Sequence, residues 1–163
     1  MTDLLETVRR IFVAAGWRSG RRVDVSAMVP SNHPASAILA EFGDLTVGDG
    51  GAGQECAKSV LAFKYVEPDR SIAVWADLLR DRLIGIADVD NGHAELYVDS
   101  SGRYYVASAV HDAFSFAGAS FAETMERLLL GRRPQPLLRQ CPANVVLYGE
   151  VFTTDDPRVY RYR

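Results

Sequence analysis

The sequence predicts a single α+β domain over residues 1–163, with a mainly antiparallel sheet of about five to six strands packed with about four helices. Four segments place apolar residues at helical spacing. Short apolar segments separated by turn-forming residues follow the third of them, which indicates an antiparallel meander. With 163 residues, 48% of them hydrophobic, the chain can bury one sizeable core.

The first two helices are predicted by their apolar faces and by their ends. The first face consists of Leu4, Leu5, Val8, Ile11, Phe12 and Ala15. Asp3 and Glu6 have the spacing of a capping box, and Gly16 stands where a left-handed helix stop is expected. The second helix begins near Pro34, a favoured first-turn residue, and stops at Gly43.

The third and fourth helices carry similar signals. Pro68 and Asp69 open the third, whose expected core face is Ile72, Trp75, Ala76, Leu79 and Leu83. Ser120, with Glu123 three residues later, marks the start of the fourth, and Gly131 marks its end.

The remaining apolar segments predict the sheet. The expected strands cover residues 45–47, 59–65, 84–88, 94–98 and 103–109. Turn residues at 90–92 and 99–102 join the last three strands into a meander. The glycine-rich segment 48–53 is expected to be an exposed, flexible loop.

Aromatic residues offer two interpretations, core packing or partner contact. Trp17 follows a helix-ending glycine, so we expect it to pack between the first helix and the sheet, with Arg21 paired to Asp24 nearby. Tyr104 and Tyr105 point to opposite faces of one strand, so the core can bury only one, which leaves the other available for recognition.

Two motifs match catalytic or nucleotide-binding patterns by letter but lack required parts. Gly48-x-Gly50-x-x-Gly53 fits the dinucleotide fingerprint, which needs a strand before it and a helix after it, whereas a strand follows here. Ser120 sits in a Gly-x-Ser-x-Ala sequence like that of a nucleophile elbow, but every histidine precedes it in the chain. A helix cap explains Ser120 without catalysis.

His93 and Glu95 copy half of a zinc deaminase site. No pair of cysteines follows to complete the ligand set, so we expect a surface pair on the solvent face of one strand. His33 is expected at a helix entry and His111 in a turn. The sequence therefore predicts no catalytic residue, no metal and no cofactor.

Charge is unevenly distributed along the chain. Residues 41–99 hold twelve acidic and five basic residues, a net charge of −7, whereas each flank carries +2. Phosphate neutralisation by basic residues supplies most nonspecific nucleic-acid affinity, so this middle argues against direct nucleic-acid binding. It either solvates the surface or suits a basic protein partner.

Targeting signals are not evident. No stretch approaches the roughly 18 apolar residues that a membrane span needs. Cys56 and Cys141 have no paired spacing, so a reducing compartment fits. We expect a cytoplasmic protein that does not bind membranes.

The order of these elements resembles that of the SUKH superfamily of bacterial immunity proteins, specifically its third subgroup. The motifs are Gly16-Trp17-x-x-Gly20-Arg21-x-Val23-Asp24, Glu41-Phe42-Gly43-Asp44-Leu45, Leu83-Ile84-Gly85-Ile86-Ala87, Leu96-Tyr97-Val98-Asp99, Gly102-Arg103-Tyr104-Tyr105 and Leu128-Leu129-Leu130-Gly131. Asp44 departs from the usual second glycine, and Ile84-Gly85 lacks the proline that often precedes that pair.

The resemblance covers about residues 4–131 and leaves 132–163 as a C-terminal extension. Proline residues, namely Pro134, Pro136 and Pro142, mark a connector there. Residues 144–152 alternate enough to add a further strand, which could pair with the sheet edge.

The resemblance implies an immunity protein, not an enzyme, that occludes the cleft of a cognate toxin domain, such as a nuclease or deaminase. Candidate partner-binding residues from the acidic middle are Asp44, Asp49, Glu55, Asp88, Asp90 and Glu95. Two alternatives stay open. One is a non-enzymatic regulatory or scaffold module of the same superfamily, and the other is an enzyme built around His93 and Glu95.

Overall fold

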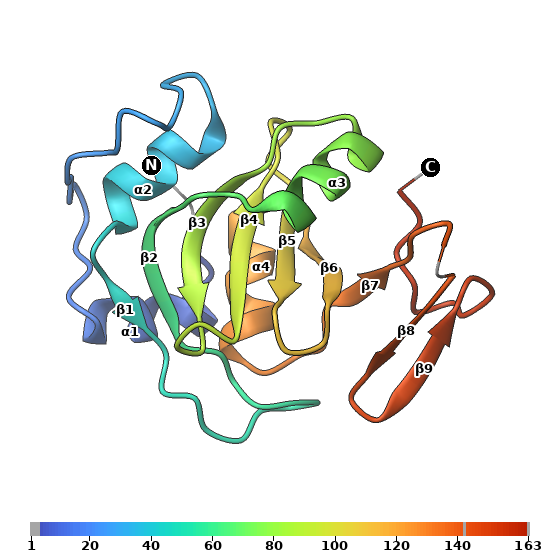
Figure 1. Ribbon diagram of the computed structural model, residues 1–163. Helices are drawn as coiled ribbons and strands as arrows, with labels where there is room; N and C mark the ends of the chain where they lie inside the picture. Colours follow the sequence, from blue (N-terminus) through green and yellow to red (C-terminus); the bar gives the residue numbers. More distant parts are fainter. Residues whose placement is uncertain (1–3, 142, 163) are drawn as a thin grey trace.

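The computed structural model describes residues 4–141 and 143–162, and it confirms the α+β class. The helices are α1 (Glu6–Ala14), α2 (Pro34–Phe42), α3 (Arg70–Leu79) and α4 (Phe121–Leu129). One sheet contains β1 (Thr46–Val47), β2 (Leu61–Val66), β3 (Ile84–Val89), β4 (Ala94–Val98), β5 (Tyr104–Ser108), β6 (Ala113–Gly118) and β7 (Gln135–Leu137). Its seven strands pair antiparallel in chain order, so the sheet is larger than predicted (Figure 1). A separate hairpin contains β8 (Asn144–Leu147) and β9 (Glu150–Thr153).

The helix ends follow local chemistry. The Asp69 carboxylate accepts from two amides at the start of α3, and Ser120 Oγ accepts from the Glu123 amide at 3.2 Å at the start of α4. His33 caps α2, as its position at the helix entry suggested, because its Nδ1 accepts from the amide two residues on. The predicted capping role of Asp3 lies outside the described residues.

The third helix is shorter than predicted. It ends at Leu79 because Arg80 adopts a left-handed conformation with φ 54°. Leu83 is nevertheless buried, in the segment that leads into β3. No described helix has the length and apolar composition needed to cross a membrane.

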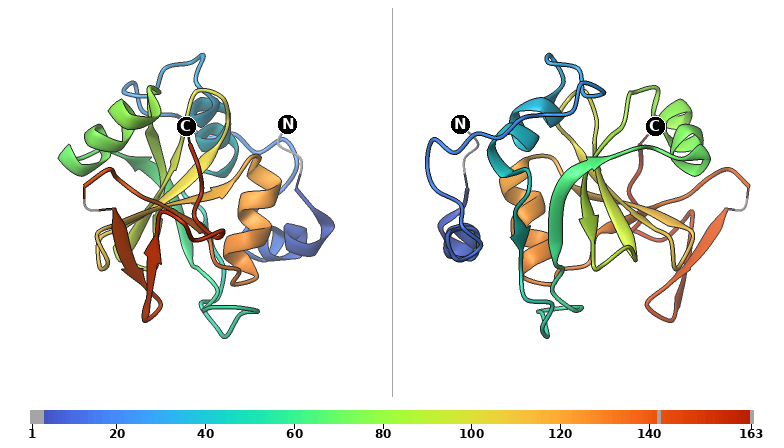
Figure 2. Two further views of the ribbon diagram at one scale, coloured as in Figure 1. Left: turned by 90° about the vertical axis from the view of Figure 1, so that its right-hand side faces the viewer. Right: turned by 60° about the vertical axis from the view of Figure 1, so that its left-hand side comes forward.

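Helices cover both faces of the sheet. In the left view of Figure 2, α1 and α4 lie on one side of the sheet and α3 lies on the other. The first face holds the larger core, in which Phe42 and Phe121 stack at 4.8 Å between ring centroids. On the second face, Trp75 of α3 stacks on Phe114 at 4.9 Å.

This two-sided cover corrects the prediction for the adjacent tyrosines. Tyr104 (4% exposed) packs in the first core, and Tyr105 (0% exposed) packs in the second. Neither ring is available for recognition, because α3 turns the second face of the sheet into a core of its own.

Trp17 packs as predicted, but its arginine neighbour does not pair as expected. The Trp17 ring is buried and stacked on Phe42 at 6.3 Å, and its Nε1 donates to Glu41. Arg21 donates to the Glu41 carbonyl oxygen at 2.9 Å and so contacts the end of α2. The predicted pairing of Arg21 with Asp24 is therefore wrong.

The extension differs from its prediction. Residues 144–152 do not form one strand on the sheet edge, because Tyr148 and Gly149 both have positive φ and turn the chain into the β8–β9 hairpin. The edge is taken by β7, which pairs with β6 and tolerates Pro136 because an outer strand needs fewer amide donors. The hairpin is attached by a small core that contains Leu147, Phe152 and Val159.

Candidate partner-binding surface

The segment 48–59, which contains the predicted glycine-rich loop 48–53, is largely exposed but is anchored by hydrogen bonds, which corrects the prediction of a flexible loop. Its amides at Gln54, Glu55 and Cys56 donate to the last carbonyls of the α4 end at 2.8–3.0 Å. A Cβ atom on Gly53 would lie 2.6 Å from the Cα atom of Gly131, so glycine permits this contact between the two backbones. The segment therefore acts as a cap on the C-terminal end of α4.

Three of the predicted acidic residues hold this segment in place. Asp49 forms an ion pair with Lys58 at 3.1 Å, and Glu55 accepts from the Arg133 amide at 2.7 Å. Asp90, in the turn after β3, accepts from the Val60 amide at 2.7 Å. The hydrogen bond from the Gly51 amide and the ammonium of Lys58 hold the pKa of Asp49 below its ordinary value. Each of these three carboxylates is therefore bonded to the segment or to a residue beside it.

Asp88 and Glu95 lie directly opposite each other on β3 and β4. Their side chains are half-buried on the face that carries α3. Asp88 accepts from the Gly92 amide at 2.8 Å, and Glu95 accepts from the Tyr97 hydroxyl. Burial and this hydrogen bond raise the pKa of Tyr97. The two carboxylates form an acidic pair on the sheet surface, and the Lys64 ammonium lies 4.0 Å from Asp88.

Asp44 lies apart from the other candidates, at the turn between α2 and β1. Its side chain is exposed, and its φ of 66° is left-handed. This conformation explains why the related motif usually has glycine here, since glycine adopts it without strain and aspartate is among the few residues that tolerate it.

Three of the other candidates, Asp49, Glu55 and Asp90, lie at one end of the molecule, which we call the loop end, and Asp88 and Glu95 lie on the adjoining ends of β3 and β4. The loop end comprises the segment 48–59, the turns at 90–93 and 109–112, and the β8–β9 hairpin, all in the lower part of Figure 1. A pocket of about 390 Å³ opens among them and is lined by His93, His111, Cys56 and Tyr148, among others.

The pocket does not bring His93 and Glu95 together. His93 lines it from a turn, whereas Glu95 lies on the opposite face of the sheet beside Tyr97. The prediction that the two side chains share the solvent face of one strand is therefore wrong. Burial raises the pKa of the Cys56 thiol and disfavours the reactive thiolate. Within residues 4–141 and 143–162, no group of three His, Cys, Asp or Glu side chains could hold a metal ion.

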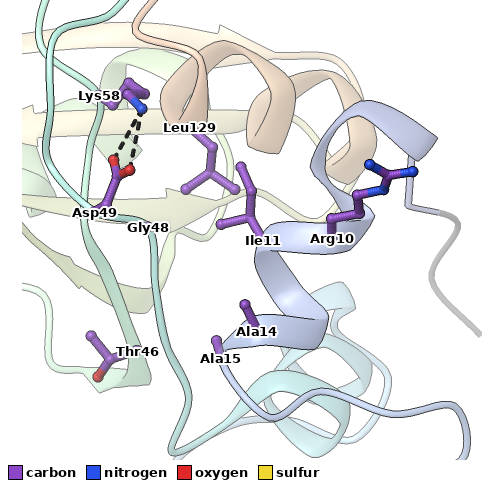
Figure 3. A pocket seen from close by; sticks show the side chains of 9 residues that line it. All are labelled: Arg10, Ile11, Ala14, Ala15, Thr46, Gly48, Asp49, Lys58 and Leu129. Atoms are coloured by element: carbon purple, nitrogen blue, oxygen red, sulfur yellow. Dashed lines mark hydrogen bonds and ion pairs between the residues drawn. The ribbon is translucent and has the colours of Figure 1, made fainter.

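A second pocket, of about 420 Å³, lies between α1 and the segment that follows β1. Figure 3 shows Ile11 and Leu129 facing each other there, with the Asp49–Lys58 pair at the rim and Arg10 pointing away. Of the charged side chains that line it, Asp49 and Lys58 are paired with each other. We therefore assign no chemistry to it.

One carboxylate that sequence reasoning did not single out is the most completely bonded. Asp99 is fully buried at the end of β4 and accepts five hydrogen bonds, from Ser101, Arg103 and Tyr105. Burial alone would raise its pKa, but these donors and the Arg103 guanidinium hold the pKa of Asp99 below its ordinary value. The Asp-Ser-Ser-Gly turn was a local signal for this structural role.

One comparison with known proteins identifies a family. A model of the SUKH-3 immunity protein family matches residues 4–131. The chain belongs to the SUKH-3 immunity protein family. The family match ends two residues after α4, so it includes β1–β6 and excludes β7 and the β8–β9 hairpin. Neither the curated proteins nor the solved structures provide a significant match.

Proposed function

We propose that this chain binds a cognate toxin domain, of the nuclease or deaminase class, and neutralises it by covering its basic substrate-binding cleft. Membership of the SUKH-3 immunity protein family carries the proposal. The interface would include the acidic residues of the loop end, and Asp44 would extend it along the sheet edge. The chain would act in the cytoplasm by binding alone and would convert no substrate.

The arrangement of the carboxylates supports this proposal. Asp49, Glu55 and Asp90 are bonded to backbone amides or to Lys58, so their positions are fixed before a partner arrives. A preorganised surface loses less conformational entropy on binding than a mobile loop. Asp88 and Glu95 add two charges on neighbouring strands. Lys58 and Lys64 offset part of this charge, but the net charge of the five carboxylates and two lysines is negative, and a net negative surface attracts a basic cleft and accelerates encounter.

The test is co-expression with the toxin domain encoded by the neighbouring gene. We expect growth rescue by the wild-type chain, formation of a complex, and an association rate that falls as salt rises. A complex without growth rescue would favour the regulatory or scaffold alternative. Absence of both rescue and complex would refute the proposal.

A charge variant locates the interface. The double variant Asp88→Asn and Glu95→Gln keeps oxygen acceptors for Gly92 and Tyr97 but removes two charges. We expect its association rate with the inactivated toxin domain to fall by roughly threefold to tenfold at low salt. The control, Asp24→Asn with Asp77→Asn, also removes two negative charges, at exposed positions before α2 and on α3, and should leave the rate unchanged.

A further inference from the structure

The outer face of the β8–β9 hairpin is apolar at its centre and carries no charge. It consists of Asn144, Val146, Val151 and Thr153. Val146 and Val151 are direct cross-strand partners, and 57% and 59% of their surfaces are exposed. Val110, in the neighbouring turn of the loop end, is also exposed. An apolar centre with a polar surround is the usual anatomy of a protein interface.

The opposite face of the hairpin is packed, so the exposed valines do not reflect a loose segment. Leu147 and Phe152 are buried there. The Arg133 guanidinium lies 4.4 Å from the Tyr148 ring centroid, and the Arg158 guanidinium lies 4.4 Å from that of Phe152. Both arginines also pair with Glu150. The hairpin is held from within and presents its other face to solvent.

This surface is unusual for an isolated hairpin. Natural proteins protect open strand edges with charged residues, prolines or covering segments. Neither β8 nor β9 pairs with another described strand, and the outer face has none of these protections. An uncharged, β-branched surface beside open edges is suited to contact with another protein.

The charges around the patch indicate what covers it. The segment from residue 144 to residue 156 contains Glu150, Asp155 and Asp156, and Asp112 follows Val110 in the neighbouring turn. Arg158 pairs with Glu150 and Asp156, and Arg133 pairs with Glu150, so these four acidic and two basic residues carry a net charge of −2. A symmetric contact between two copies would bring these acidic segments together, which is unfavourable. The charge pattern instead fits a partner whose apolar patch has basic residues at its rim.

We propose that the β8–β9 hairpin contacts the cognate toxin and determines which toxin this chain recognises. The inference rests on the proposed function and adds the surface that supplies specificity. The hairpin lies beyond the residues that the family model matches. The loop end would steer the encounter by charge, and the valine pair would slow dissociation.

A double variant, Val146→Thr with Val151→Thr, tests this proposal. Threonine keeps the β-branched shape but places a hydroxyl where the partner would bury a methyl group. With the inactivated toxin domain from the neighbouring gene as the probe, we expect about tenfold weaker binding, mainly through faster dissociation. The control is Val13→Thr with Val74→Thr, which changes two exposed valines on α1 and α3 and should bind like wild type.

The outcomes separate this inference from the proposed function. Wild-type binding that the hairpin variant retains in full would overturn the inference and leave the proposed function intact. Failure of the wild-type chain to bind the probe would refute the proposed function, and the inference with it. Sedimentation of the free wild-type chain as a dimer, and of the hairpin variant as a monomer, would show that a second copy covers the patch and would also overturn the inference.

Discussion

The family-matched part of the molecule and its C-terminal extension use the same kinds of residue in opposite ways. In the matched part, helices bury both faces of the sheet, and even Asp99 is enclosed and fully bonded. In the extension, the β8–β9 hairpin buries one face and exposes two valines on the other. The first arrangement stabilises a fold that members of a family can share, and the second provides a surface that can differ between them.

The comparison predicts that substitutions in the matched part change stability, whereas substitutions on the outer face of the hairpin change binding. The largest effect is expected at Asp99. Asp99→Asn removes the charge that pairs with Arg103 and places an amide among several donors. We expect a loss of about 2–4 kcal/mol in the free energy of unfolding, measured by urea denaturation. Asp155→Asn, at an exposed site, is the control and should change it by less than about 0.5 kcal/mol.

The same variant has a defined pH dependence. The pKa of Asp99 in the folded state lies below the unfolded value of about 3.9. Its ionised carboxylate therefore contributes stability that is complete above that value and is lost as pH falls through the folded pKa. The difference between wild type and Asp99→Asn should be constant above about pH 5 and shrink below about pH 4. A difference that persists unchanged at pH 3 would contradict this assignment.

A smaller effect is expected where the glycine-rich segment meets α4. A Cβ atom on Gly53 would lie 2.2 Å from the Cys56 carbonyl oxygen, so Gly53→Ala must displace the backbone. We expect a loss of about 1–3 kcal/mol in the free energy of unfolding. Gly51→Ala, where the nearest atom would lie at 3.6 Å, should be close to neutral. Equal effects of the two substitutions would mean that the segment is as flexible as its composition suggested.

These sites illustrate which parts of the fold could be predicted from the sequence. The caps at Asp69 and Ser120 were predictable because their partners lie within three residues. The contact between Gly53 and Gly131 was not, because it joins segments far apart in the chain. Strand β6 was missed because all six of its residues are buried, which removes the alternation that marks a half-exposed strand.

The candidate surface was only partly predictable for a similar reason. Sequence position identified an acidic middle. The fold brings three of the six candidates to the loop end, places Asp88 and Glu95 on the strand ends beside it, and keeps Asp44 apart. The exposed ring expected at Tyr104 or Tyr105 does not exist, because the cover that α3 gives to the second face depends on tertiary packing. The exposed valine pair could not be predicted from the sequence. Residues 144–152 were predicted as one strand, whereas the turn at Tyr148 and Gly149 places Val146 opposite Val151.

The junction between the two parts should show an intermediate effect. Tyr160 of the extension stacks on Phe116 of the sheet with ring centroids 4.1 Å apart, and its amide bonds to Pro136. Tyr160→Ala should lower the free energy of unfolding by about 1–2 kcal/mol. Tyr160→Phe keeps the ring and serves as the control. In Tyr160→Ala, amide hydrogen exchange should accelerate relative to wild type more in β7 than in β3. Equal acceleration in both strands would mean that the two parts unfold as one unit.

The smallest effect on stability is expected at the valine pair, where the expected effect on binding is nevertheless large. Because Val146 and Val151 are exposed and contact solvent in the free chain, their replacement by threonine removes little buried apolar surface. We expect the free energy of unfolding to change by less than about 0.5 kcal/mol in the double variant. A loss above 1 kcal/mol would show that these side chains stabilise the hairpin itself, as Leu147 and Phe152 do from the other face. Unchanged stability together with weakened toxin binding would instead separate the residues that maintain this fold from those that select its partner.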